Sequence, residues 1–404
     1  MPSDCELTFV QVLSRHGARY PTAKKSKKYK KLVTEIQANA TAFTGKYSFL
    51  RSYNYALGSD DLTTFGKHQM INSGTKFHRR YEALARDNAP FIRSSNSSRV
   101  VESGNLFLAG FEKARIVDQH ADHQLPTPEI SVIISEDHGF NNSLNHNSCP
   151  YFEDGKHGDS ASKHYTTLLV SSIKRRLETD LPGVRLSDKQ VTYLMDLCAF
   201  DTVSSTPDGS KLSPFCNLFD SSEWAQYDYL QSLSKYYTYG AGNPLGPSQG
   251  VGFVNELISR LNNTPVHDHT TTNRTLDAPD AGTFPLNRTI YADFTHDNGM
   301  IPVFFALGLY NDTEPLPITH VQSAKDSNGY SASWTVPFGA RAYIEMMQCK
   351  SQPDPEPLVR VLVNDRVVPL HGCPVDSLGR CRRSDFIEGL SFARSGGNWT
   401  SCYA

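Results

Sequence analysis

Residues 7–21 read LTFVQVLSRHGARYP, and this stretch decides the fold. Leu7–Leu13 is a short run of apolar and β-branched residues, which predicts a buried strand. A polar loop follows, and a helical pattern runs from about Lys27 to Asn39. Open α/β sheets hold their ligands where a strand turns into a helix, because free N–H groups at the helix start face the ligand. The stretch therefore predicts both an α/β sheet and a site at its edge.

The turn itself carries Arg15, His16, Gly17 and Arg19. Arginine keeps its charge and its planar fork matches phosphate oxygens, while a neutral histidine can attack phosphorus. Glycine allows the backbone to approach a ligand closely. A histidine beside a single arginine is usually structural, but the full R-H-G-x-R-x-P string is far more specific. It predicts phosphoryl transfer to His16.

The rest of the chain predicts an α/β domain with a mostly helical insertion. Further strand-like runs are 90–93, 130–135, 289–294, 341–348, 358–363 and 367–370, and helical patterns are 65–84, 99–115, 165–177, 189–199, 222–237, 251–262 and 298–309. We expect a mainly parallel sheet flanked by helices in residues 1–29, 87–136 and 285–404, and a smaller, mostly helical domain in 30–86 and 137–284. The tracts 263–285 and 311–328 are rich in Thr, Asn, Asp and Pro, which predicts exposed loops. Asn364-Asp365-Arg366 is typical of a hairpin turn.

Three of the predicted strands end in residues that can bind phosphate. They end at Ser14–Gly17, at Ser94–Arg99 and at Thr295–Gly299. Each could be an ordinary helix cap or ion pair when taken alone. If the strands are parallel, however, all three ends lie at one edge of the sheet and surround one ligand.

Four segments resemble the histidine acid phosphatases, and within them the secreted fungal phytases. They are VLSRHGARYP (12–21), FIRSSNSSRVVESG (91–104), YADFTHDNG (291–299) and VRVLVNDRVVPLHGCPVDSLGRC (359–381). The resemblance covers nearly the whole chain from Cys5. It implies a histidine-phosphatase-like fold, with the active site between a large α/β domain and a smaller α domain.

The resemblance and the chemistry together imply roles for individual residues. His16 would form a phosphohistidine, and Asp297 would protonate the leaving alcohol and then assist the attacking water. The phosphate oxygens would be held by Arg15, Arg19, Arg99 and His296. The charge of the bound phosphate should raise the pKa of Asp297, which predicts activity in the acid range. The scheme needs no metal and no cofactor.

Phytate carries several phosphates besides the one cleaved, so its binding requires further cations. Six lysines crowd the segment 24–31, and such a run is usually a solvated face, but here it lies close to the predicted site. Lys25, Lys28 and Lys235 match lysines that bind substrate in the family. Asp60 and Asp61 correspond to an acidic stretch that lines the family's pocket.

Composition indicates a soluble globular protein, and we expect it to be secreted and to act as a monomer on the small-molecule substrate that the resemblance implies. The 404 residues carry a net charge of -2, which gives no bulk attraction to nucleic acid, and the longest apolar run (300–309) is too short to cross a membrane. Eight dispersed cysteines favour disulfides over metal, and spacing alone leaves on the order of a hundred pairings open. The resemblance implies Cys5–Cys349, Cys149–Cys402, Cys198–Cys216 and Cys373–Cys381. Eight N-x-S/T sequons also favour secretion and glycosylation: Asn39, Asn96, Asn141, Asn262, Asn273, Asn287, Asn311 and Asn398.

Other functional classes of protein remain open at this point. The segment 246–250 reads GPSQG and matches the nucleophile elbow of serine hydrolases, although no strand precedes it. Histidines at 120, 123, 267 and 269 could bind zinc, but they lie in polar tracts, where exposed histidines are expected. A third reading is an inert anion- or carbohydrate-binding module. A fourth is a transferase like phosphoglycerate mutase, which shares the Arg-His-Gly core.

Overall fold

The centre of the molecule is a mixed sheet that holds the predicted strands. The computed structural model describes residues 4–278, 282–350 and 356–403, and within these ranges eight strands form one sheet in the order β3-β2-β4-β1-β5-β6-β7, with β8 paired to β6. Their bounds are β1 Cys5–Arg15, β2 Phe91–Ser95, β3 Val132–Ile134, β4 Ile290–Thr295, β5 Arg341–Cys349, β6 Leu358–Val363, β7 Arg366–Val367 and β8 Cys381–Arg382.

The sheet has a parallel half and an antiparallel half. Strands β3, β2, β4 and β1 run parallel to one another. Strand β5 joins β1 in the antiparallel sense, and β6, β7 and β8 continue that pattern. The α/β class and the parallel sheet are therefore as expected in the half that ends in the predicted site residues.

Helices surround the sheet, and the longer ones start where the sequence places caps. Asp220 and Glu223 form a capping box at the start of α8, and Ser187 and Gln190 form one at α7. The helices are α1 Ala23–Asn39, α2 Thr64–Arg80, α3 Glu82–Ala85, α4 Ser98–Val117, α5 Pro150–Glu153, α6 His157–Asp180, α7 Asp188–Ser205, α8 Ser221–Tyr239, α9 Val251–Asn262, α10 Asp297–Ala306, α11 Ala332–Thr335, α12 Arg383–Gly389 and α13 Ser391–Arg394.

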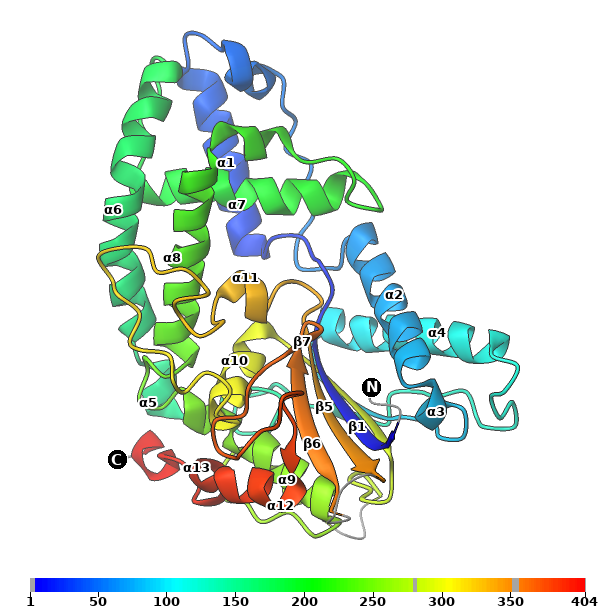
Figure 1. Cartoon of the computed structure of the whole chain (residues 1–404). Helices are drawn as coiled ribbons and strands as arrows, with labels where there is room; N and C mark the ends of the chain where they lie inside the picture. The colour runs from blue at the N-terminus through cyan, green and yellow to red at the C-terminus, as the bar shows by residue number, and fades with distance from the viewer. Residues whose placement is uncertain (1–3, 279–281, 351–355, 404) are drawn as a thin grey trace.

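The alternation of side chains along β1 divides the core between the two faces of the sheet. Val10 and Val12 pack with α2 and α4 through Met70 and Phe107. The opposite face belongs to the larger cluster, which continues through α9 and α10 into the helical group of α1, α6, α7 and α8 (Figure 1). The sheet face and the helical group thus share one continuous core.

The division into two domains stays a proposal, and the packing of two helices changes where we draw the boundary. Helix α2 lies within 30–86 but packs on α4 against the sheet, and α9 lies within 137–284 but packs on α10 and α13 beside the sheet (Figure 1). The helical group away from the sheet consists of α1, α6, α7 and α8. We therefore place α2 and α9 with the α/β part.

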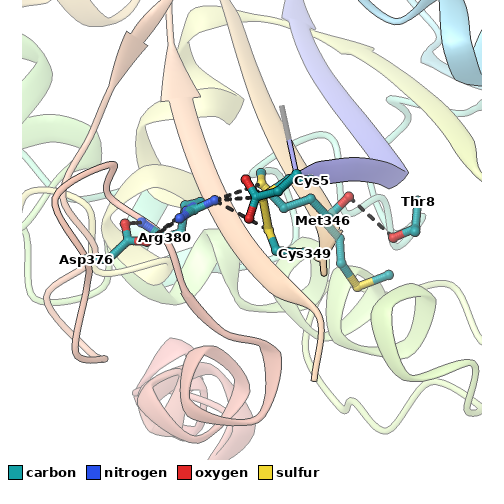
Figure 2. The surroundings of a disulfide bond; sticks show 8 residues. Cys5, Thr8, Met346, Cys349, Asp376 and Arg380 are labelled. Atoms are coloured by element: carbon teal, nitrogen blue, oxygen red, sulfur yellow. Dashed lines mark hydrogen bonds and ion pairs between the residues drawn. A yellow bond between two sulfur atoms is a disulfide. The ribbon is translucent and has the colours of Figure 1, made fainter. Parts of the chain in front are cut away.

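All four implied disulfides are present: Cys5–Cys349, Cys149–Cys402, Cys198–Cys216 and Cys373–Cys381. The first joins β1 to β5, at residues that are direct partners in the register. Figure 2 shows Arg380 reaching this bond: its Nη1 lies 3.1 Å from the Cys5 Sγ, and its guanidinium also pairs with Asp376. The strand that carries Arg15 and His16 is thereby fixed covalently at its far end.

Loop regions differ from expectation in two respects. The hairpin at 364–366 is present, with positive φ at Asn364 and Asp365, although β7 is shorter than the expected 367–370. The tract 263–285 contains no helix or strand in its described residues, but it is not simply exposed: Asp268, Thr271 and Asp277 are buried. The Asp268 carboxylate explains this, because it accepts hydrogen bonds from Thr270 and Thr272 and so satisfies the polar groups of the buried loop.

Candidate active site

The three strand ends named from the sequence do meet at one edge of the sheet. Arg15 of β1 pairs with Thr295 of β4, and the neighbouring register places Ser94 of β2 beside Phe294. Each strand is followed within a few residues by a helix or turn, and His296 is the N-cap residue of α10. The parallel half of the sheet therefore assembles the site from segments about 280 residues apart.

His16 is buried and held in one orientation. Its ring Nδ1 lies 2.8 Å from the Gly17 carbonyl oxygen, which can only accept, so Nδ1 carries the proton and Nε2 holds the lone pair. Burial, followed by the charge of Arg15, holds the pKa of His16 well below its usual value. The imidazole is thus neutral and nucleophilic. Gly17 is required here, because a Cβ would lie 2.5 Å from the Gly66 carbonyl oxygen.

Three arginines surround this ring, and their charges oppose one another. Burial and the nearby Arg99 lower the pKa of Arg15, and burial with both neighbours lowers the pKa of Arg19 to about 10. Among the described residues, the Nε atoms of Arg15, Arg19 and Arg99 are buried with no hydrogen-bond partner. Unpaired donors and mutually repelling cations are both satisfied when an anion binds between them.

Phe338 orders two of these arginines. The Arg15 guanidinium lies over its ring at 4.5 Å from the centroid, and that of Arg19 lies at 5.8 Å. The same ring is 6.0 Å from the ring of His16. Arg15 also donates to the Val336 carbonyl oxygen. The segment 336–338 therefore forms one wall of the site, although it carries no charged group.

His296 lies edge-on to His16, with ring centroids 5.5 Å apart. Its Nε2 lies 2.9 Å from Glu136 Oε1, and the same carboxylate oxygen accepts a 2.7 Å hydrogen bond from the buried Ser95 hydroxyl. Burial alone would raise the pKa of Glu136, but His296, Ser95 and Arg99 together lower it. Glu136 is therefore ionised beside the imidazole.

Asp297, the first residue of α10, lies between two cations. Its Oδ1 is 3.5 Å from Arg15 Nη2, and its Oδ2 contacts Lys235 Nζ. Burial would raise the pKa of Asp297, but Arg15 and Lys235 hold it well below the usual range. The carboxyl group is thus ionised in this ligand-free form, whereas the expected proton donor must be neutral. The raised pKa expected from bound phosphate requires that these ion pairs first loosen.

A cavity of about 660 Å³ extends from the reacting groups toward the helical part of the molecule. The charged residues of its lining include Arg15, Arg19, Lys25, Lys235 and Asp297. Lys25 is held there by Asp196 at 3.2 Å and lies 4.6 Å from the ring centroid of Tyr193. The cavity can therefore hold a ligand larger than one phosphate group.

The structure places the other expected substrate residues differently. Lys28 is exposed and does not line the cavity. Lys235 is not distal, because it contacts Asp297 directly. Asp60 accepts a hydrogen bond from the backbone N–H of Ala23 at 2.9 Å, so it caps α1. Asp61 is exposed, and its carbonyl oxygen accepts from the Tyr20 backbone N–H.

The competing sites lack the geometry they need. Ser248 is fully buried in a 3-10 turn, and its Oγ accepts from the Asn398 backbone N–H at 2.9 Å, so it is not presented as a nucleophile. The four histidines at 120, 123, 267 and 269 are exposed. Among the described residues, no group of three or more His, Cys, Asp or Glu side chains is arranged to hold a metal ion, and no helix is long and apolar enough to cross a membrane.

Sequence reasoning missed Glu136 and Phe338. Glu136 directly follows the predicted strand 130–135, so it obeys the same strand-end rule that identified the other residues. Phe338 gives no such signal, since an isolated aromatic residue is usually part of the core. Asp196, which binds Lys25 and also accepts hydrogen bonds from Tyr29 and Tyr227, lies within α7, where nothing in the local sequence marks it as part of a site.

Comparison with known proteins places the chain among phosphatases. Residues 6–364 match the family model described as histidine phosphatase superfamily (branch 2). Phytase A of Penicillium oxalicum is 65% identical over 402 residues, covering 100% of this chain and 87% of the relative. Phytase A of Aspergillus fumigatus is 62% identical over 404 residues, covering 100% and 86%.

A solved structure shows the same overall arrangement. The crystal structure of the phytase from D. castellii superposes with a TM-score of 0.79 at 26% sequence identity. The alignment covers 100% of this chain and 82% of that one.

Proposed function

Because the chain belongs to the histidine phosphatase superfamily (branch 2), we propose that it is a phosphomonoester hydrolase, a phytase that hydrolyses phytate through a phosphohistidine intermediate. The close relatives named Phytase A support the substrate. The observation that carries the proposal is the group of three arginines with unpaired buried Nε atoms around a neutral, oriented His16.

The first half of the reaction is displacement at phosphorus. The scissile phosphate binds among Arg15, Arg19 and Arg99, with His296 as a further donor. The lone pair on His16 Nε2 attacks phosphorus, forming the N–P bond while the P–O bond to the alcohol breaks. Asp297 gives its proton to the departing oxygen, so the inositol leaves as a neutral hydroxyl.

The second half returns the enzyme to its starting state. The Asp297 carboxylate takes a proton from a water molecule, which attacks phosphorus on the opposite side from the N–P bond. That bond breaks, inorganic phosphate is released, and the electron pair returns to His16 Nε2. The chemistry uses only side chains of this chain.

Lys235 links substrate binding to the protonation of Asp297. The bound phosphate dianion draws Arg15, and a neighbouring phosphate of phytate competes for the Lys235 ammonium. Both ion pairs of Asp297 then weaken, so its pKa rises and it accepts the proton that it later donates. Activity in the acid range follows. Lys25, which also lines the cavity, binds another phosphate of the same ring, whereas Lys28 lies outside the lining.

The four disulfides support a secreted, extracellular location, because such bonds persist in oxidising compartments. We expect the enzyme to act as a monomer that carries glycans at some of its sequons.

The experiment that tests this function compares initial rates on phytate and on p-nitrophenyl phosphate between pH 3 and pH 8. The proposal expects turnover of both, with higher efficiency on phytate at acid pH and none in the His16→Ala variant. Equal efficiency on the two substrates would reduce the assignment to a broad acid phosphatase. Absence of phosphate release from either would leave only an inert anion-binding module.

A further inference from the structure

The contact between Glu136 and His296 has a consequence for how the site recognises phosphate. Glu136 Oε1 is 2.9 Å from His296 Nε2, and a carboxylate accepts hydrogen bonds, so Nε2 carries a proton. His296 is the N-cap residue of α10, but its side chain makes no capping hydrogen bond. The other ring nitrogen, Nδ1, is therefore not used by the helix.

Whether Nδ1 carries a proton decides whether His296 attracts or repels the substrate. In a neutral ring with its proton on Nε2, Nδ1 has a lone pair, which would face a phosphate oxygen with like charge. Only the imidazolium can donate from Nε2 to Glu136 and from Nδ1 to phosphate at the same time. A full negative charge at Glu136 favours that cationic form.

The surroundings keep Glu136 ionised. The fully buried Ser95 hydroxyl donates to Oε1 at 2.7 Å, and the Asn147 amide donates to the Glu136 carbonyl oxygen at 2.7 Å, which fixes the backbone. Arg99 adds a positive charge nearby. Among the described residues, the charged and titratable groups near His296 also include its chain neighbour Asp297, which is ionised and paired with Arg15, and His16, which is neutral and lies edge-on to it.

We propose that Glu136 is a positioning residue that holds His296 as an imidazolium. His296 then still donates a hydrogen bond to the substrate phosphate toward the upper end of the working pH range. The proposal rests on the proposed phosphatase function. The Glu136 carboxylate contacts Ser95 and His296, so it acts through His296, and it follows β3, the fourth parallel strand of the sheet.

The test is the pH dependence of phosphate recognition in the Glu136→Gln variant. Glutamine keeps a hydrogen-bond acceptor of the same length and removes only the charge. We expect the pH above which inorganic phosphate inhibits less strongly to move down by about one unit, which is about a tenfold weaker inhibition constant above that pH and little change at the acid end. Inhibition by phosphate is the primary measurement because it does not require proton donation by Asp297, and kcat/KM for p-nitrophenyl phosphate should fall over the same pH range. The Glu136→Asp variant, which keeps the charge, should recover part of the shift.

Asp137→Asn is the matched control, because Asp137 is the exposed next residue and its carboxylate accepts a hydrogen bond from the Ser135 hydroxyl rather than from His296. This variant should leave the pH dependence of kcat/KM and of phosphate inhibition unchanged. A pH dependence of phosphate inhibition in Glu136→Gln that coincides with that of Asp137→Asn would overturn the inference. Circular dichroism melts of each variant check folding, and direct titration of inorganic phosphate by calorimetry gives the same readout without turnover. If the unmodified chain neither releases nor binds phosphate, the proposed function fails instead, so the two failures are distinguishable.

Discussion

The ammonium group of Lys235 lies against the carboxylate of Asp297, and it also lies 2.5 Å from Asn298 Oδ1. Lys235 comes from α8 of the helical group and Asp297 from the helix that starts at the sheet edge. The ion pair therefore connects the two parts of the molecule across the cavity. It also means that the proposed proton donor is ionised until a ligand competes for its partner.

Removing the ammonium should move the pH dependence of the reaction upward. In Lys235→Met, Asp297 loses one of the two cations that lower its pKa, so the carboxyl group stays protonated to a higher pH. The alkaline limb of kcat on p-nitrophenyl phosphate should rise by about one pH unit, since a charge contact of this kind is worth about that much. Lys28→Met is the control, because Lys28 is exposed and lies outside the cavity lining. Identical limbs in both variants would show that Lys235 does not control Asp297.

Phe338 should affect substrate binding more than chemistry. Its ring lies beneath the guanidinium groups of Arg15 and Arg19, so Phe338→Leu keeps an apolar side chain but removes both cation–π contacts. We expect KM for p-nitrophenyl phosphate to rise about five- to tenfold, with kcat reduced less than twofold, because the two contacts together contribute roughly 1 kcal/mol. Steady-state kinetics measure the two constants separately. The exposed Phe140 provides the control variant Phe140→Leu, and a fall in kcat with an unchanged KM would contradict this role.

A buried carboxyl group far from the chemistry should make stability depend on pH. Burial, with the nearby Glu256, raises the pKa of Asp277 to about 8, and its Oδ2 has no hydrogen-bond partner among the described residues. An acid with a raised folded pKa binds more protons when folded than when unfolded. Its contribution to the free energy of unfolding is therefore fully present below the unfolded value near 4 and is lost as pH rises toward 8.

Asp277→Asn removes that pH dependence. The variant should melt at nearly the same temperature as the unmodified chain at pH 4 and a few degrees higher at pH 7, as measured by scanning calorimetry. Asp326→Asn, on an exposed loop residue, is the control. A variant that melts lower at pH 7 would show that the carboxylate is stabilised in the folded chain.

The sequence predicted the elements that follow clear periodicity and the residues that end strands. The strand 358–363 and the helix 251–262 have the predicted bounds, and the three strand ends carrying Arg15, Arg99 and Asp297 lie together as expected. These predictions are confirmed because the periodicity of apolar residues and the strand-to-helix turns are local signals in the sequence.

The remaining features depend on contacts between distant segments, which local patterns do not encode. Nothing near Lys235 in the sequence indicates that it pairs with Asp297, 62 residues away. The assignment of α2 to the sheet follows from its packing on α4, where Gly74 allows close approach: a Cβ there would lie 1.8 Å from the Phe107 carbonyl oxygen. The buried loop around Asp268 has a polar sequence that predicts exposure, but its polar groups are satisfied by hydrogen bonds within the loop and from the distant Asn141 and Asn255.

The central claim is that His16 accepts the phosphoryl group. The direct measurement is rapid quenching of the enzyme in base during turnover of ³²P-labelled phytate, followed by peptide mapping by mass spectrometry under conditions that preserve N–P bonds. The account predicts an alkali-stable, acid-labile label on the peptide containing residues 12–21, located on His16, and no label in His16→Ala. A label on any other residue, or full turnover in His16→Ala, would contradict it.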